Sequence, residues 1–304
     1  VLSLEANSSQ MEIALVRNKK EEGEKEIPQE RRTKKGGKAT KRNRLNVKGM
    51  FRVKEGRFQG VGFQDLFLAG EEMKGGELKI EKFSLAAFKG KLGGSGGIDR
   101  GKDSFPFQIK TQITGVDVNA VLSDLTSWKG MMKGRLYGRM SLEGKGGSLA
   151  SLKRDLTGKG KIRVREGELS WLNIVAQIVR ALGGKGWEKE KTTFEDLSTS
   201  FIVQRGKVSF PDLLISHKDM EIRMWGDMDL DLQLKVEGEA HLPPSATKDL
   251  SGKGWRYFKD EGGRLTIPFT LRGDLKNPEV GISTRFIERG IEGVLEEFLR
   301  KKLR

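Results

Sequence analysis

The side chains that most often carry catalysis are scarce in this sequence. Its 304 residues contain no cysteine and only two histidines, His217 and His241. Without cysteine the chain cannot form disulfides, thiolate-bound metal sites or cysteine nucleophiles. Neither histidine lies in a context that resembles a catalytic triad or a metal-binding motif, so each is interpreted as a satisfied or surface histidine.

An acidic triplet, Asp227, Asp229 and Asp231, resembles a metal site at first sight. A calcium loop that began at Asp227 would need glycine at its sixth position and glutamate at its twelfth, where this sequence has Leu232 and Gly238. The residues between the aspartates are apolar and typical of strands. The triplet is therefore predicted to lie on the solvated face of a β-strand.

Two glycine-rich stretches could in principle hold phosphate groups. These are "GGSGG" from Gly93 and "EGKGGS" from Glu143. Neither has the GxxxxGK[ST] pattern, and no GxGxxG opens a helix after a strand, so both are predicted to be turns. The sequence thus predicts no catalytic residue, no metal site and no cofactor, and we expect a protein that is not an enzyme.

Positive charge is concentrated in one segment. The net charge is +15, and residues 17–48 hold 13 Lys and Arg against 5 Glu, a surplus of 8. This segment is nearly free of apolar residues, so it is predicted to be a disordered loop or linker. A functional anion-binding loop is the alternative, whereas an aromatic content of 7% argues against a nucleic-acid partner.

Much of the remaining sequence alternates apolar and polar residues with the period of a β-strand. Residues 227–236 are predicted to form one amphipathic strand, and the alternation recurs at 105–109 and 265–271. With 40 glycines, this pattern favours a mainly β chain in which an antiparallel sheet has one apolar face. The apolar positions of the three stretches are Phe105, Phe107, Ile109, Met228, Leu230, Leu232, Leu234, Val236, Leu265, Ile267, Phe269 and Leu271.

The chain also repeats itself, in two tandem copies at about residues 49–146 and 158–284. "FRVKEG" from Phe51 is answered by "IRVREG" from Ile162, and "GRLYGRMSLEG" from Gly134 aligns without gaps with "GRLTIPFTLRG" from Gly263. The segments between them follow in the same order in both copies. The sequence therefore predicts one long sheet built from two repeats.

Helical patterns are few. Short helices are predicted at 117–128 and 148–156, a buried one at 169–182, and an amphipathic helix at 285–303 that packs on the end of the sheet. The chain starts at Val1 in a strand-like stretch, without a signal peptide or a spanning segment. Residues 1–16 are accordingly expected to end a preceding β region, and a membrane anchor is expected in a longer parent protein.

An ordered set of segments resembles the C-terminal region of the AsmA-like proteins, relatives of TamB. The segments are "GKGKIRVREGELSWLNIV", "FEDLSTSFIVQRGKVSFPDLLI" and "LTIPFTLRGDLKNPEV", and the resemblance covers about residues 49–284. It implies a periplasmic envelope protein of a diderm bacterium that is held to the inner membrane by an N-terminal helix. It also implies a taco-like or half-barrel β groove whose apolar interior lets phospholipids pass between membranes, with no catalytic residues.

Alternation alone leaves two interpretations of the apolar face: it forms the interior of a closed sandwich, or it forms an open trough for acyl chains. The resemblance favours the trough. The expected partners are then phospholipid or another acyl-chain lipid, the membrane, and possible envelope proteins, and the twelve apolar positions above are the candidate lining residues. The alternative is an envelope assembly factor that uses the same sheet to contact outer-membrane proteins.

Overall fold

The strands predicted from the alternation join a single sheet. The computed structural model describes residues 4–6, 11–17, 47–58, 60–73, 75–102, 104–146, 149–170, 172–181, 191–218, 220–244, 259 and 261–282. The helices are α1 (Val118–Leu125), α2 (Leu149–Asp155) and α3 (Ile174–Ala181). The strands are β1 (Leu4–Ala6), β2 (Met11–Arg17), β3 (Val47–Phe58), β4 (Val61–Glu72), β5 (Glu77–Ala87), β6 (Gly90–Asp99), β7 (Pro106–Asp117), β8 (Met132–Lys145), β9 (Thr157–Leu169), β10 (Thr192–Gln204), β11 (Lys207–His217), β12 (Met220–Asp229), β13 (Gln233–Leu242), β14 (Leu265–Asp274) and β15 (Glu279–Ile282).

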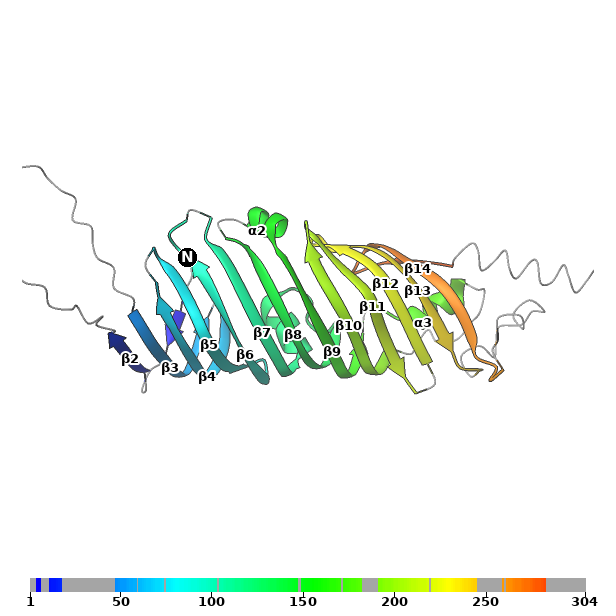
Figure 1. Ribbon diagram of the computed structural model, residues 1–304. Helices are drawn as coiled ribbons and strands as arrows, with labels where there is room; N and C mark the ends of the chain where they lie inside the picture. The colour runs from blue at the N-terminus through cyan, green and yellow to red at the C-terminus, as the bar shows by residue number, and fades with distance from the viewer. Residues whose placement is uncertain are drawn as a thin grey trace, which may run out of the picture.

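The sheet is a long meander. From β3 to β15 each strand pairs antiparallel with the next strand in the sequence, and β1 and β2 both pair with β3. Among the described strands, β15 at one end does not pair with β1 or β2 at the other, so this sheet is curved but not closed (Figure 1). The predicted mainly β fold with a long curved antiparallel sheet is confirmed.

The internal repeat corresponds to a shift of six strands along this meander. "FRVKEG" lies in β3 and "IRVREG" in β9, while the gap-free pair of segments lies in β8 and at β14. The two predicted copies therefore correspond to β3–β8 and β9–β14. The β3–β4 connection differs from its counterpart: Phe58 ends β3 only shortly before Val61 begins β4, whereas the segment between Leu169 and Thr192 contains α3.

Strand pairing places the apolar residues of successive strands on one face. Ile215 on β11 pairs with Ile222 on β12, which pairs with Ala240 on β13, which pairs with Ile267 on β14. Paired residues of neighbouring strands project from the same side of a sheet. The sheet thus has an apolar face and a polar face, and residues of α1 and α3 pack on the apolar face, with α3 behind the sheet in Figure 1.

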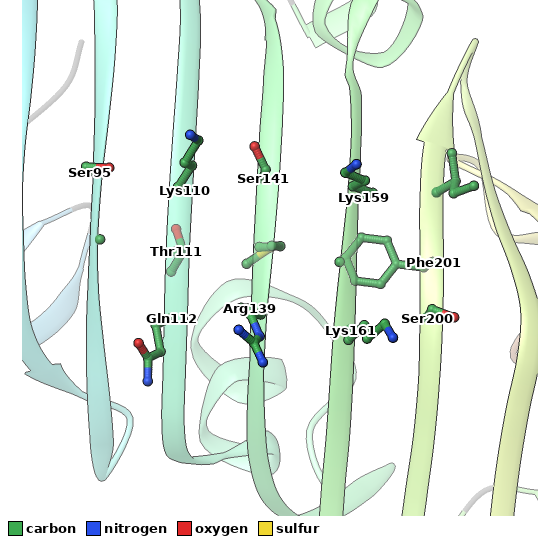
Figure 2. A pocket seen from close by; sticks show the side chains of 14 residues that line it. Ser95, Lys110, Thr111, Gln112, Arg139, Ser141, Lys159, Lys161, Ser200 and Phe201 are labelled. Carbon is green, nitrogen blue, oxygen red and sulfur yellow. The ribbon is translucent and has the colours of Figure 1, made fainter.

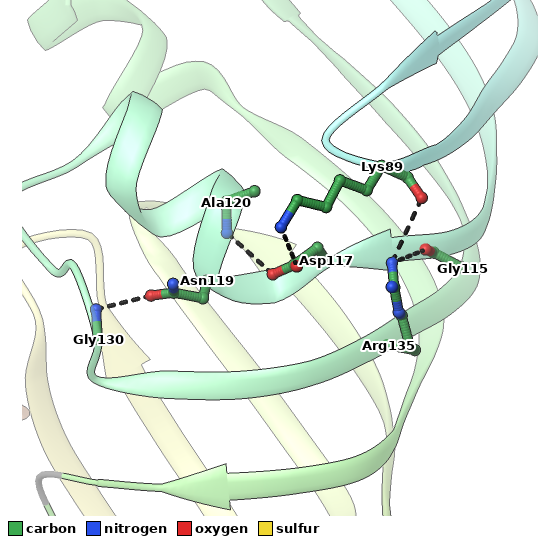
Figure 3. Close-up of polar contacts among 7 residues, drawn as sticks. All are labelled: Lys89, Gly115, Asp117, Asn119, Ala120, Gly130 and Arg135. Carbon is green, nitrogen blue, oxygen red and sulfur yellow. Dashed lines mark hydrogen bonds and ion pairs between the residues drawn. The ribbon is translucent and has the colours of Figure 1, made fainter.

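Helix α1 forms where the sequence predicts it, with Asp117 as its N-cap. The Asp117 carboxylate accepts a hydrogen bond from the Ala120 amide (3.1 Å) and forms an ion pair with the Lys89 ammonium (3.3 Å), as Figure 3 shows. Arg135 on β8 donates to the carbonyl oxygens of Lys89 and Gly115, both at 3.3 Å. These contacts fix the start of α1 to the β5–β6 turn and to the end of β7.

The other helical predictions have mixed outcomes. Helix α2 forms within the predicted stretch 148–156. Helix α3 begins at Ile174 rather than at residue 169, because Leu169 is the last residue of β9 and pairs with Thr192. Residues 18–46 of the predicted basic loop and the predicted helix at 285–303 lie outside the described residues. β1 and β2, which come before that loop, belong to the same sheet as β3.

The interpretation of "GGSGG" as a turn is wrong, because Gly93 to Gly97 lie in the middle of β6. A Cβ on Gly94 would clash with the carbonyl oxygen of Lys110 on β7, and one on Gly96 would lie 2.6 Å from that of Gln108. Glycine in a strand interior marks such close approaches of neighbouring backbones. Of "EGKGGS", residues 143–145 end β8, and the stretch then connects to α2.

The prediction of one continuous strand over 227–236 is also wrong. β12 ends at Asp229 and β13 starts at Gln233, and the Asp229 carboxylate accepts hydrogen bonds from the Asp231 and Gln233 amides, both at 2.9 Å. Leu232 has φ +69, which an extended strand does not allow. Asp229 thus organises a turn, while Asp227 accepts from Ser209 on β11 and Asp231 pairs with Lys153 on α2.

At the C-terminal end the Asn-Pro turn leads into a further strand and not directly into a helix. Residues 279–282 form β15, which pairs with β14 from Phe269↔Ile282 to Arg272↔Glu279. The sequence signal for this strand is short, because only Val280 and Ile282 are apolar and glycine lies between them. A strand of only four residues is too short to be identified from apolar–polar alternation.

Glu168 at the end of β9 provides a pH-dependent contribution to stability. Its carboxylate accepts from the Ser170 hydroxyl and from Lys191 (2.9 Å) and lies 3.4 Å from the Lys133 ammonium. The Ser170 hydrogen bond and then the Lys191 contact lower the pKa of Glu168 from 4.5 to about 2. A carboxylate with a lowered pKa stabilises the fold fully above its unfolded value and loses that contribution as the pH falls toward the folded value.

We therefore expect Glu168→Gln to flatten the fall in unfolding free energy between about pH 4.5 and pH 2, compared with the unaltered protein. Denaturant unfolding at a series of pH values measures this. Glu143→Gln, at an exposed glutamate of β8, is the control and is expected to leave the slope unchanged. Equal slopes for the unaltered protein and Glu168→Gln would contradict the assignment.

Candidate functional site

The apolar face of the sheet is the candidate functional surface. In its N-terminal half, three rows of paired residues cross the strands from β5 towards β10. One row runs Leu78, Ile98, Phe107 and Gly144; the second runs Ile80, Gly96, Ile109, Leu142, Gly158 and Val203; the third runs Phe83, Gly94, Thr111, Met140, Gly160 and Phe201. Each row contains large apolar side chains and at least one glycine, so the surface is mainly apolar and has little side-chain bulk at the glycines.

Most large side chains of these rows are only partly buried. They belong to neither of the two described hydrophobic core clusters, and we call them the open apolar strip: Leu78, Ile80, Phe83, Ile98, Phe107, Ile109, Met140, Leu142 and Phe201. The small cluster beside the strip has only Val53, Phe63 and Ala87 as buried members. Among the described elements, helix α1 contacts β7 and β8 and α2 contacts β8, and no helix covers β3–β6.

Phenylalanine rings lie over cross-strand glycines along the apolar face. In each case the ring and the glycine are paired residues, and a Cβ on the glycine would lie 3.1 Å or less from a ring carbon. The absence of a Cβ lets the ring lie flat against the partner strand, which covers its backbone without filling the space above the sheet. The pairs are Phe83 with Gly94, Phe107 with Gly144, Phe201 with Gly160, Phe194 with Gly167 and Phe269 with Gly238.

The C-terminal half of the apolar face is a closed core. Ile174, Val175 and Ile178 of α3 belong to the same cluster as the core residues of β9–β14, and each is no more than 2% exposed. Lys276 in the β14–β15 turn lies 5.6 Å from the Trp128 ring in the β7–β8 connection, so these two connections meet on the apolar side. No acyl chain can reach side chains enclosed in this way without displacing α3.

The predicted lining residues therefore divide into groups. Six of them are core residues of the closed half, with exposures of 9% or less: Leu234, Val236, Leu265, Ile267, Phe269 and Leu271. Met228 is partly buried against the same core. Phe107 and Ile109 lie in the open apolar strip, where solvent reaches them.

Three predicted positions do not follow the alternation. Phe105 precedes β7, has φ +41 and is 41% exposed, so the strand that would point it into the apolar face has not yet begun. Leu230 and Leu232 lie in the turn between β12 and β13. The strip residues Leu78, Ile80, Phe83, Ile98, Met140, Leu142 and Phe201 were missed, although the match between the two copies points to β5 and β8 as equivalents of β11 and β14.

One of the two histidines has a polar partner on the neighbouring strand. The Nδ1 atom of His241 lies 2.9 Å from the Thr266 hydroxyl, which gives this histidine a structural partner. Within the described part of the chain, no group of His, Asp and Glu side chains could hold a metal ion. The described helices also include none that is both long enough and apolar enough to cross a membrane.

Comparison with known proteins gives one result. A family described as the AsmA family matches residues 59–213, just over half of the chain, from the β3–β4 turn into β11. This range contains all of the open apolar strip. No curated protein and no solved structure gives a significant match.

Proposed function

The chain belongs to the AsmA family, and we propose that it is a non-enzymatic cell-envelope protein whose open apolar strip shields phospholipid acyl chains during transfer between membranes. The proposal places it in the periplasm of a diderm bacterium, anchored to the inner membrane in its full-length form. Phospholipid is the proposed partner, and no cofactor takes part.

One observation carries the proposal: the apolar face is mostly buried in one copy of the repeat and partly exposed in the other. In β9–β14 most of the face is buried in the core cluster that includes α3, apart from the part of β10 around Phe201. In β5–β8 the equivalent face is built from large apolar side chains that stay partly exposed, with no described helix over β5 and β6. Exposing contiguous apolar surface is unfavourable unless a ligand or partner covers it, and each CH₂ group buried contributes about 0.8 kcal/mol.

The strip suits acyl chains because it offers apolar contact without polar groups that demand partners. Across a sheet, strands lie about 4.8 Å apart, so the strip from β5 to β10 spans on the order of 25 Å. This is comparable to the length of an extended acyl chain, which rows of Leu, Ile and Phe side chains would contact along its whole length.

The test is a photocrosslinking experiment on protein purified without detergent. A photoreactive amino acid at Leu142, in the strip, is expected to crosslink to phospholipid that mass spectrometry of the adduct identifies. The same group at Glu143, the neighbouring residue on the polar face and outside the groove described below, is the matched control. Lipid adducts that are absent at both positions, or equally abundant at both, would contradict the proposal.

A further inference from the structure

The polar face, opposite the strip, has a basic groove across β6–β10. Its walls are two rows of paired residues, Ser95, Lys110, Ser141, Lys159 and Ile202 on one side and Gln112, Arg139, Lys161 and Ser200 on the other. Between them runs the backbone of the row whose side chains point to the apolar face. The groove has a volume of about 740 Å³, and Figure 2 shows the two rows on either side of it.

The cations of this groove are only partly neutralised by the protein: the pKa of Asp212, beyond β10, is lowered first by the Ser200 hydroxyl and also by the charge of Lys161. Among the described residues, no carboxylate forms an ion pair with Lys110, Arg139, Lys159 or Lys161. Next to the groove the pattern changes, because Arg163 on β9 pairs with Asp196. The carboxylate of Asp212, beyond β10, is held by the hydroxyl and the amide of Ser200. The positive charge is therefore concentrated in the groove itself.

Phosphate is the ligand chemistry that this arrangement fits. Lysine and arginine side chains supply charge and donors, and the hydroxyls of Ser95 and Ser141 and the amide of Gln112 add neutral donors within the same two rows. At one end of the groove Ile202 is 51% exposed on the same face. An exposed apolar side chain beside cations is typical of surfaces that meet anionic lipid, where charge and apolar contact add.

We propose that this groove binds the phosphate groups of anionic lipid headgroups at a membrane surface. Binding there would orient the sheet with its polar face on the membrane and leave the apolar strip free on the other side. The proposal does not depend on acyl-chain shielding by the strip, since the two faces are separate surfaces.

The absence of cysteine allows a local measurement on the full chain. A single cysteine at Ser141 carries an environment-sensitive fluorophore in the groove, and one at Lys235, on the same face of β13, is the control label. Vesicles of phosphatidylcholine with phosphatidylglycerol are expected to shift the emission at residue 141 only, and vesicles of phosphatidylcholine alone to shift neither. Arg139→Gln with Lys161→Gln is expected to weaken the response roughly 30-fold, at about fivefold per charge, while Lys207→Gln leaves it unchanged.

Other outcomes decide against the proposal. A response that survives the double substitution would show that charges elsewhere bring the protein to the vesicle. Inorganic pyrophosphate could saturate the labelled groove while vesicles give no response. That result would mean that the groove binds a soluble phosphate ligand, and it would overturn the proposal that the phosphate belongs to a membrane lipid. Ile109→Asp on the apolar strip should leave the vesicle response intact, so failure of the strip hypothesis and failure of this one are distinguishable.

Discussion

Ile109→Asp is expected to remove bound acyl-chain lipid from the protein while the fold survives. Ile109 lies in the middle of β7, in the row between Gly96 and Leu142, and belongs to neither core cluster. A carboxylate at this position would lie among acyl chains, and burying an unpaired charge there costs several kcal/mol. We expect the lipid content per protein to fall about tenfold or more.

The neighbouring residue provides the matched control. Gln108 is exposed on the polar face of the same strand, so Gln108→Asp introduces the same charge one position away without touching the strip. Quantitative mass spectrometry of extracted lipid, with circular dichroism to confirm folding, measures both variants. If Ile109→Asp kept its lipid, or kept its cellular function without lipid, the assembly-factor alternative, in which the sheet contacts proteins, would gain over the lipid conduit.

Period-two alternation and internal repetition predicted most of the architecture because both are local properties of the sequence. The repeat "FRVKEG" and "IRVREG" marks β3 and β9, and the capping position of Asp117 marks the start of α1. Alternation also fixes which side chains share a face. It does not fix where a strand stops, so the turn that Asp229 organises divides the predicted strand 227–236.

The roles of the glycines could not be predicted from alternation, since they depend on pairing between strands. Gly94 and Gly160 lie in strand interiors beneath the rings of Phe83 and Phe201, which are not their neighbours in the sequence. Only the register of β5 with β6 and of β9 with β10 brings each ring over its glycine. When the pairing of neighbouring strands is not known, a glycine-rich stretch inside a strand therefore resembles a turn.

Whether the apolar face is open or closed depends on one insertion. Helix α3 lies between β9 and β10, and the equivalent connection between β3 and β4 is too short to hold a helix. The helix joins the core of the copy in which it is inserted, whereas the contacts of the described helices α1 and α2 with the other copy are at β7 and β8. A comparison of the two copies, taken connection by connection, would have indicated that the lining candidates of β13 and β14 are core residues.

This division predicts a large difference between two chemically identical substitutions. Phe269 is 1% exposed in the closed half, and its ring lies over Gly238, with the ring Cζ 2.8 Å from where a Cβ on that glycine would be. Phe269→Ala is expected to lower the unfolding free energy by about 3–5 kcal/mol, because it removes the buried ring and leaves a cavity. Phe201 makes the same kind of contact with Gly160 but is partly exposed in the open strip.

Phe201→Ala is therefore the matched control, and its loss is expected to stay near 1 kcal/mol, since solvent already reaches part of the ring and no closed cavity forms. Urea unfolding monitored by tryptophan fluorescence compares the two variants under one set of conditions. Added phospholipid should stabilise the unaltered protein more than Phe201→Ala if the ring contributes to the acyl-chain surface, because a ligand stabilises only the state that binds it. Equal losses for the two variants would mean that the strip around Phe201 is as closed as the core around Phe269, and the strip would then lack the exposure on which its lipid role depends.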